Sequence, residues 1–151
     1  MNQISIEELA NWFLAKESMT HKKLQKVCYY GVAWGWALMD RSVISDDGFQ
    51  AWVHGPVAPK LYDRYKKNGW NDIPRVAAKD TAKVAGDIAD LLESVWITYG
   101  EKSGNELEAL SHSEKPWIEA RAGLESSESS NNPISTDVMA KFYNSIKSTE
   151  Y

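Results

Sequence analysis

The chain has 151 residues, 43% of them hydrophobic, with seven tryptophans, seven tyrosines and one cysteine, Cys28. This length predicts a single domain with a sizeable core, while one cysteine excludes an intrachain disulfide and disfavours a thiolate zinc site. The net charge is −4, yet residues 1–75 hold 10 basic and 8 acidic residues and residues 76–151 hold 7 and 13; the acidic second half argues against general nucleic-acid binding.

The first two predicted elements are helices with capping residues at their N-termini. Ser5 and Glu8 form a capping box for a helix that ends near Ala15. Thr20 caps a longer helix that runs to about Asp40, in which apolar residues recur at helical spacing. These residues are Leu24, Val27, Cys28, Trp34 and Leu38.

Three small residues in the second helix point to tight packing. Gly31 and Gly35 lie one turn apart, and because glycine inside a helix costs about 1 kcal/mol relative to alanine, we expect a neighbour that approaches closely there. Cys28 lies on the apolar pattern and is predicted to be a buried, inert thiol.

A basic cluster marks the start of the same helix. It consists of Lys16, His21, Lys22, Lys23 and Lys26. We interpret it as a solvated helix start, and the alternative is a small DNA-binding surface, which would require these side chains to stand clear of the fold.

A small β-hairpin is predicted from Val43-Ile44, a turn at Ser45–Gly48 and the alternating run Phe49–Val53. Gly55-Pro56, here called the first elbow, ends the run, because glycine permits unusual backbone angles and proline fixes φ. If the alternation holds, Trp52 lies on the opposite strand face from Phe49, Ala51 and Val53.

The remaining chain is predicted to be helical apart from two irregular segments. A helix from Pro59 to Asn68-Gly69 is followed by a loop, and the apolar stripe of Asp80–Tyr99 predicts a core helix. Ser103 and Glu106 form another capping box, and Ser111–Trp117 is here called the second elbow, with Pro116 opening a helix to Ala122. Glu125–Pro133 is a Ser-rich linker that we expect to be mobile and dispensable for folding, and Ser135 caps a last amphipathic helix.

The predicted fold class is therefore mainly α, a compact bundle of about seven helices with one small hairpin. Residues 1–124 form the helical domain, 125–133 the linker, and 134–151 a helix that packs on the same domain. The N-terminus is polar and no apolar run approaches the roughly 20 residues that span a bilayer, so we expect a cytoplasmic protein without membrane contact.

His54 and His112 are the two residues that favour an enzymatic interpretation. No nucleophile elbow, metalloprotease motif or phosphate-binding loop accompanies them, and their separation matches no metal-ligand spacing. We predict structural roles for both, with partner contact as the alternative, and no metal and no cofactor. An enzyme would require a polar cleft that joins them.

Several segments together resemble the Panacea domain, over roughly Thr20 to Ala122. They are Lys23-Leu24-Gln25-Lys26, Tyr29-Tyr30, Ala51-Trp52-Val53-His54-Gly55-Pro56-Val57, Leu61-Tyr62, Tyr99-Gly100, Glu106-Leu107, Leu110-Ser111-His112 and Pro116-Trp117. The resemblance implies a mainly helical, prophage-associated, SocA-like antitoxin that neutralises a co-encoded toxin by direct binding. In the SocA branch it also implies an adaptor that delivers the toxin to a protease.

The expected partner is therefore a protein, and two sets of residues are predicted around the elbows. The partner-binding set is Trp52, His54, Val57, Lys60 and Arg64, because a rigid bend with tryptophan and arginine suits an interface. The structural set is Gly55, Pro56, His112, Pro116 and Trp117. The alternatives to an antitoxin that masks its toxin are a proteolysis adaptor and, from another class, an enzyme that uses His54 and His112.

Overall fold

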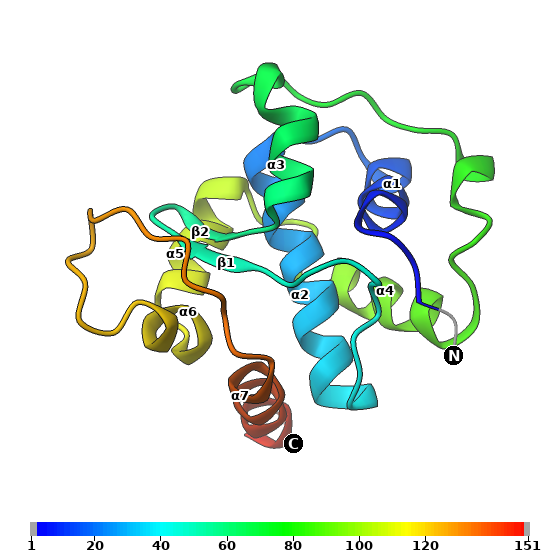
Figure 1. The fold of residues 1–151 in the computed structure, drawn as a ribbon. Coiled ribbons are helices and arrows are strands. Elements are labelled where there is room, and N and C mark those ends of the chain that lie inside the picture. The colour runs from blue at the N-terminus through cyan, green and yellow to red at the C-terminus, as the bar shows by residue number, and fades with distance from the viewer. Residues whose placement is uncertain (1–2, 150–151) are drawn as a thin grey trace.

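One helix, α2 (His21–Met39), forms the centre of the fold (Figure 1). The computed structural model describes residues 3–149, and within them strand β2 and five helices pack against α2. The five are α1 (Ile6–Lys16), α3 (Pro59–Tyr65), α4 (Gly86–Tyr99), α5 (Gly104–His112) and α7 (Thr136–Thr149). The short helix α6 (Lys115–Ala120) packs on α5 and α7. The mainly α prediction is confirmed.

The two glycines of α2 lie where other elements come closest. A methyl group at Gly35 would approach Val43 Cγ1 to 2.9 Å, and one at Gly31 would approach Leu92 Cδ2 to 3.0 Å. The predicted close neighbours are therefore present, and they come from the chain after α2 and from α4. Cys28, which precedes both glycines in α2, is fully buried.

The hairpin forms from different residues than predicted. Strand β1 (Gln50–Trp52) pairs antiparallel with β2 (Gly55–Val57), so the first elbow is itself a strand. Val43-Ile44 was the wrong partner, since Ile44 forms a parallel bridge with Ile4 instead. The reason is a tertiary contact: Asp46 in the predicted turn accepts a hydrogen bond of 2.6 Å from the Ile6 N–H and so holds this segment against the start of α1.

Helix α4 begins later than its predicted start at Asp80. A 3₁₀ turn, η2 (Ala78–Thr81), precedes it, and Gly86 has a left-handed φ of +57° that breaks the continuity. The predicted core stripe is confirmed, with Ile88 and Leu92 among its buried residues. Helix α3 ends at Tyr65, and the 3₁₀ turn η1 (Lys66–Asn68) continues to Gly69, where the helical segment was predicted to end.

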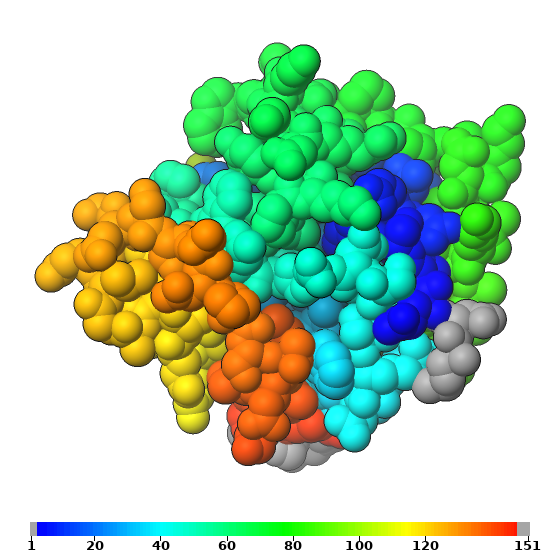
Figure 2. Space-filling view, viewed as in Figure 1, coloured from blue at the N-terminus to red at the C-terminus, as the bar shows by residue number. Residues whose placement is uncertain are grey.

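The Ser-rich segment 125–133 carries no helix or strand, but it is anchored at both ends. The Arg121 guanidinium donates hydrogen bonds to the carbonyls of Glu125 and Glu128. At the other end Pro133 bridges to Gln50 of β1, so the segment (orange) lies along the hairpin in Figure 2. Its mobility stays a prediction, now confined to the residues between the anchors.

A buried polar network attaches α7 and α6 to α2. Glu114 precedes α6 and accepts hydrogen bonds of 2.8 Å from the hydroxyls of Tyr30 and Tyr143. The Tyr30 ring also stacks on Tyr99 of α4, with centroids 3.9 Å apart. Burial raises the pKa of the Glu114 carboxyl, against the effect of the two hydroxyl donors. One carboxyl therefore links α2 and α7 to the start of α6.

We expect Glu114→Gln to preserve stability at pH 7, because the amide oxygen still accepts hydroxyl hydrogen bonds and no charge is buried. Glu114→Leu should lower the free energy of unfolding by about 1–3 kcal/mol, since the Tyr30 hydroxyl loses its acceptor. Urea unfolding of both variants measures the difference.

The Glu114 carboxyl should also make the free energy of unfolding depend on pH. A carboxyl whose folded pKa is raised contributes stability below its unfolded pKa, and that contribution is lost as pH rises through the folded pKa. As pH rises above about 4.3, the ordinary pKa of a glutamate, the wild type should therefore lose stability relative to Glu114→Gln. Equal stability of the Gln and Leu variants would contradict this role.

Candidate functional site

Three members of the basic cluster, His21, Lys23 and Lys26, are buried, so the interpretation as a solvated helix start was wrong for them, whereas Lys16 is exposed and Lys22 is half-buried. Lys23 is 8% exposed and Lys26 is 2% exposed. The Lys23 amine donates to the Gly100 carbonyl at 2.6 Å, and the Lys26 amine donates to the Pro56 carbonyl at 3.1 Å. Long aliphatic stems allow this, because they cross apolar surface and deliver the charged head to an acceptor. The DNA-binding alternative lacks the free basic face that it requires.

Lys26 passes directly beneath the first elbow. A Cβ at Gly55 would lie 2.7 Å from Lys26 Cε, and Gly55 also has a φ of +108° that favours glycine. Burial lowers the pKa of the Lys26 amine to about 7; the Glu108 carboxylate opposes this shift, and Lys22 adds to it. Glycine at position 55 therefore leaves room for a buried amine under the hairpin.

A second side chain of α2 fixes the start of α3. Gln25 Oε1 accepts a hydrogen bond of 2.9 Å from the Ala58 N–H, and its Nε2 lies 3.4 Å from the Ala58 carbonyl. Gln25 Nε2 also contacts His21 Nε2 at 3.0 Å. Burial, with a smaller contribution from Lys26, lowers the pKa of His21 to about 4, so His21 is a neutral acceptor at pH 7.

The second elbow holds the hairpin from the other side. The Trp117 indole N–H donates to the Trp52 carbonyl at 2.8 Å, and the Arg121 guanidinium donates to the Ala51 carbonyl at 2.9 Å. The His112 ring stacks on Trp117 with centroids 4.0 Å apart. Pro116 lies in the first turn of α6. The residues of the predicted structural set thus lie around one hairpin.

These contacts shape a groove of about 790 Å³, here called the aromatic groove. Its walls carry three large rings: Trp52 and Tyr62 lie 4.9 Å apart between centroids, and Trp70 is 81% exposed. The lining residues are His21, Lys22, Gln25, Lys26, Trp52, Val53, His54, Val57, Tyr62, Lys66, Gly69, Trp70, Ser129, Ser130 and Asn131. Five parts of the chain therefore contribute to one surface.

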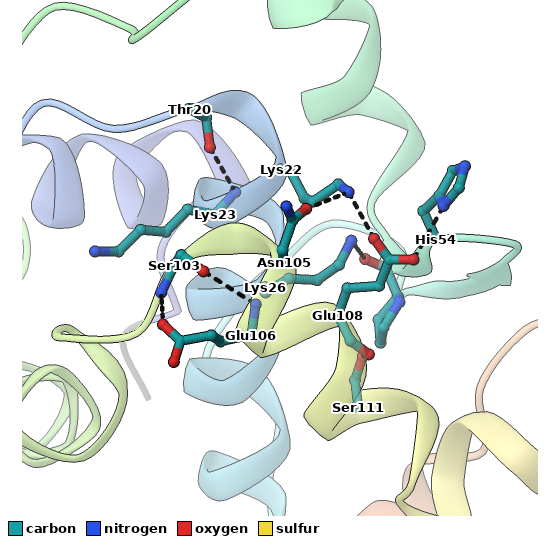
Figure 3. Close-up of polar contacts among 11 residues, drawn as sticks. Thr20, Lys22, Lys23, Lys26, His54, Ser103, Asn105, Glu106, Glu108 and Ser111 are labelled. Atoms are coloured by element: carbon teal, nitrogen blue, oxygen red, sulfur yellow. Dashed lines mark hydrogen bonds and ion pairs between the residues drawn. The ribbon is translucent and has the colours of Figure 1, made fainter. Parts of the chain in front are cut away.

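The charge on this lining is of one sign. Among the described lining residues three are lysines and none is acidic, although the whole chain has a net charge of −4. Glu108 of α5 lies behind the rim, where it accepts hydrogen bonds from Lys22 at 2.6 Å and pairs with His54 Nδ1 at 3.0 Å (Figure 3). Burial opposes ionisation of Glu108, but these two donors hold its pKa below the usual value.

The predicted partner-binding residues do not all lie on one surface. Trp52, His54 and Val57 line the aromatic groove. Lys60 pairs with Asp46 at 2.9 Å and lines a separate hollow of about 630 Å³. Arg64 is exposed and donates to the Tyr65 hydroxyl at 3.1 Å, outside the groove lining.

Sequence reasoning missed Trp70 and the basic side chains of α2 as part of this surface. Trp70 lies in a predicted loop, and a tryptophan after Gly69 in a polar turn was the available signal. His21, Lys22 and Lys26 had been assigned to a solvated helix start. Their position in the groove depends on α3 and the hairpin packing beside them.

The groove does not join the two histidines of the enzyme hypothesis. It contains His54, whereas His112 lies against Trp117 and outside the described lining. Across residues 3–149 no three His, Cys, Asp or Glu side chains gather as a metal site would require. Burial also raises the pKa of the Cys28 thiol far above its usual range, as expected for an inert thiol.

Comparison with known proteins gives one family. A family model described as "Antitoxin SocA-like, Panacea domain" matches residues 24–118, which is more than half of the chain. No curated protein and no solved structure matches. Within residues 3–149 no helix has the combined length and apolar character of a membrane span.

Gly55→Ala should lower the free energy of unfolding by about 2 kcal/mol or more, because it adds backbone strain of roughly 1–3 kcal/mol and displaces Lys26. Gly48→Ala is the matched control, since no atom lies within 4 Å of its Cβ position and its φ is not in the left-handed region. Denaturant unfolding of both variants provides the comparison. A similar effect of the two substitutions would show that the space above Lys26 is not critical.

Lys26→Met should change how stability depends on pH. The folded pKa of Lys26 is about 7, so between pH 7 and about 10 the folded state binds fewer protons than the unfolded state. The wild type should therefore gain stability relative to Lys26→Met as pH rises through this range, by up to about 1.4 kcal/mol per pH unit. Lys141→Met, at an exposed position, is the control, and parallel curves for wild type and Lys26→Met would exclude a buried amine with a lowered pKa.

Proposed function

Because the chain belongs to the antitoxin SocA-like, Panacea domain family, we propose that it is an antitoxin that neutralises a co-encoded toxin by binding it through the aromatic groove. The observation that carries this proposal is the exposure of large rings on a fixed support. Trp70 is 81% exposed and Tyr62 is 37% exposed, on a chain whose other aromatic rings are mostly packed inside. Tryptophan and tyrosine dominate the energetics of protein interfaces.

The support beneath these rings favours tight binding. Trp52 is held by its indole hydrogen bond of 2.8 Å to Gln50, and its carbonyl is held by Trp117. A wall that is already ordered loses little conformational entropy when a partner docks, so more of the contact energy appears as affinity. The aromatic groove therefore suits a single tight interface, which is all that masking a toxin requires.

The proposed role involves no reaction of the chain itself. His54 pairs with a carboxylate at the groove rim, and His112 is stacked beneath the hairpin. Both arrangements serve to hold loops, and neither places a nucleophile beside a base within hydrogen-bond reach. We propose that the histidines act through stability or partner contact.

A proteolysis adaptor is the second candidate, because it needs a surface besides the toxin-binding one. One observation favours it: Ile97 on α4 is 79% exposed and lies outside the groove lining. The C-terminal helix α7 does not offer such a surface, since it packs on α2 with Met139 and Tyr143 fully buried. Toxin abundance separates the two roles, because masking preserves the toxin and delivery to a protease depletes it.

We expect co-expression with an adjacent toxic gene to restore growth, with the two proteins co-purifying. Trp70→Ala and Trp52→Ala should each abolish rescue and weaken binding by about 2 kcal/mol or more, as measured by calorimetry. Ile118→Ala is the control, because Ile118 is an exposed apolar residue outside the groove lining and its variant should rescue fully.

Arg64→Glu and Lys60→Glu extend the same assay to the rest of the predicted partner-binding set. Loss of rescue in either would extend the interface around α3, beyond the groove. Full rescue by folded Trp52→Ala and Trp70→Ala proteins would place the toxin on another face. Immunoblots of the toxin distinguish masking from degradation in the same cultures.

A further inference from the structure

We infer, on the basis of the proposed function, that the aromatic groove recognises an extended segment of its protein partner in which an aromatic or aliphatic side chain lies next to a carboxylate. The inference names the chemistry of the partner segment. It depends on how rings and cations are placed relative to one another in the groove.

The rings define where an apolar side chain would bind. Trp52 and Tyr62 meet at a tilted angle of 56°, and Trp70, next to Gly69, lines the same groove. An apolar side chain between them would cover ring surface that is now exposed, at about 25 cal/mol per Å² of apolar area removed from water. A volume of about 790 Å³ is near the upper end of the roughly 300–1,000 Å³ of small-ligand sites, so several residues of an extended chain fit.

The cations lie immediately beside these rings. Lys22 Nζ is 5.5 Å from the centroid of the Trp70 ring, so its charge borders the apolar surface. Lys66 also lines the groove, and Lys26 lies at the groove floor. A segment whose apolar side chain enters between the rings therefore brings its neighbouring side chain to a lysine.

The partners of these lysines leave capacity for one more carboxylate. Lys22 is shared between Glu108 and Asn105, and within residues 3–149 the ion pair of Lys66 is a long contact of 3.5 Å to the exposed Asp63. Each ammonium has three donors. Glu108 also shows that this rim accommodates a carboxylate, held between Lys22 and His54 (Figure 3).

Glu108 also bears on which anion is favoured. Its charge at the rim reduces the attraction for a multiply charged phosphate chain more than for a single carboxylate. Nucleic-acid binding needs several phosphate contacts and a basic footprint, whereas this groove has three lysines on an acidic chain. The charge balance therefore favours a peptide that carries one or two acidic residues.

The test is selection of random 12-residue peptides displayed on phage against the wild-type chain. We expect enrichment of sequences with Asp or Glu beside Phe, Trp or Leu. One enriched peptide, made with a fluorescent label, should lose about tenfold in affinity, or about 1.4 kcal/mol, on Trp70→Ala, on Lys66→Glu, and when its acidic residue is replaced by the corresponding amide.

Two controls match those variants. Ile97→Ala removes an equally exposed apolar side chain, and Lys141→Glu reverses a lysine that also pairs with an acidic residue of its own helix. Both should bind the peptide within about twofold of wild type, a difference below about 0.5 kcal/mol. Circular dichroism confirms that every variant is folded.

Several outcomes would overturn the inference. They are no enrichment, enriched peptides without a carboxylate, equal binding of the amide peptide, and a labelled single-stranded DNA 12-mer that binds more tightly than the selected peptide. The experiment distinguishes failure of this inference from failure of the proposed function. Peptide binding without toxin neutralisation would reject the antitoxin role and keep the groove specificity, whereas neutralisation with any of the outcomes above would do the reverse.

Discussion

The structure depends on the burial of a lysine. Lys26 lies on a helix that is buried over most of its length. Its amine donates a hydrogen bond to the carbonyl of Pro56. A buried ammonium without an acceptor is costly, and burial already lowers its pKa to about 7. The hairpin is therefore fixed in the one position in which its carbonyl meets the amine, and only a glycine at position 55 leaves room for the lysine stem.

The same principle organises the rest of the shell around α2. Lys23 reaches the Gly100 carbonyl at the end of α4, and Gln25 pairs with the backbone of Ala58 at the start of α3. Two further carbonyls of the hairpin accept hydrogen bonds from Trp117 and Arg121. Buried polar side chains need hydrogen-bond partners, and this need specifies where the loops lie, while apolar packing supplies most of the stability.

This arrangement separates a rigid support from a surface that is free for binding. The hydrogen bonds of the hairpin face inward, toward α2 and α6, and the rings of Trp52, Tyr62 and Trp70 face the groove. The Panacea match over residues 24–118 covers both the support and most of the groove lining. A binding domain built in this way can keep its support while the residues at the groove rim change, because the rim residues carry few of the structural hydrogen bonds.

The sequence by itself determined the local features. The capping boxes Ser5/Glu8 and Ser103/Glu106 are present, and the α4 stripe is buried. Caps and stripes depend on residues three or four positions apart, so local spacing is sufficient to predict them.

Only the tertiary structure decided the strand pairing and the site. Asp46 draws the predicted first strand to α1, and the groove assembles residues as distant as His21 and Asn131. The spacing of charges in a helix is the same whether a lysine faces water or a carbonyl on another segment. The burial of Lys26, and with it the position of the groove, therefore depends on acceptors about 30 residues further along the chain, which no local pattern encodes.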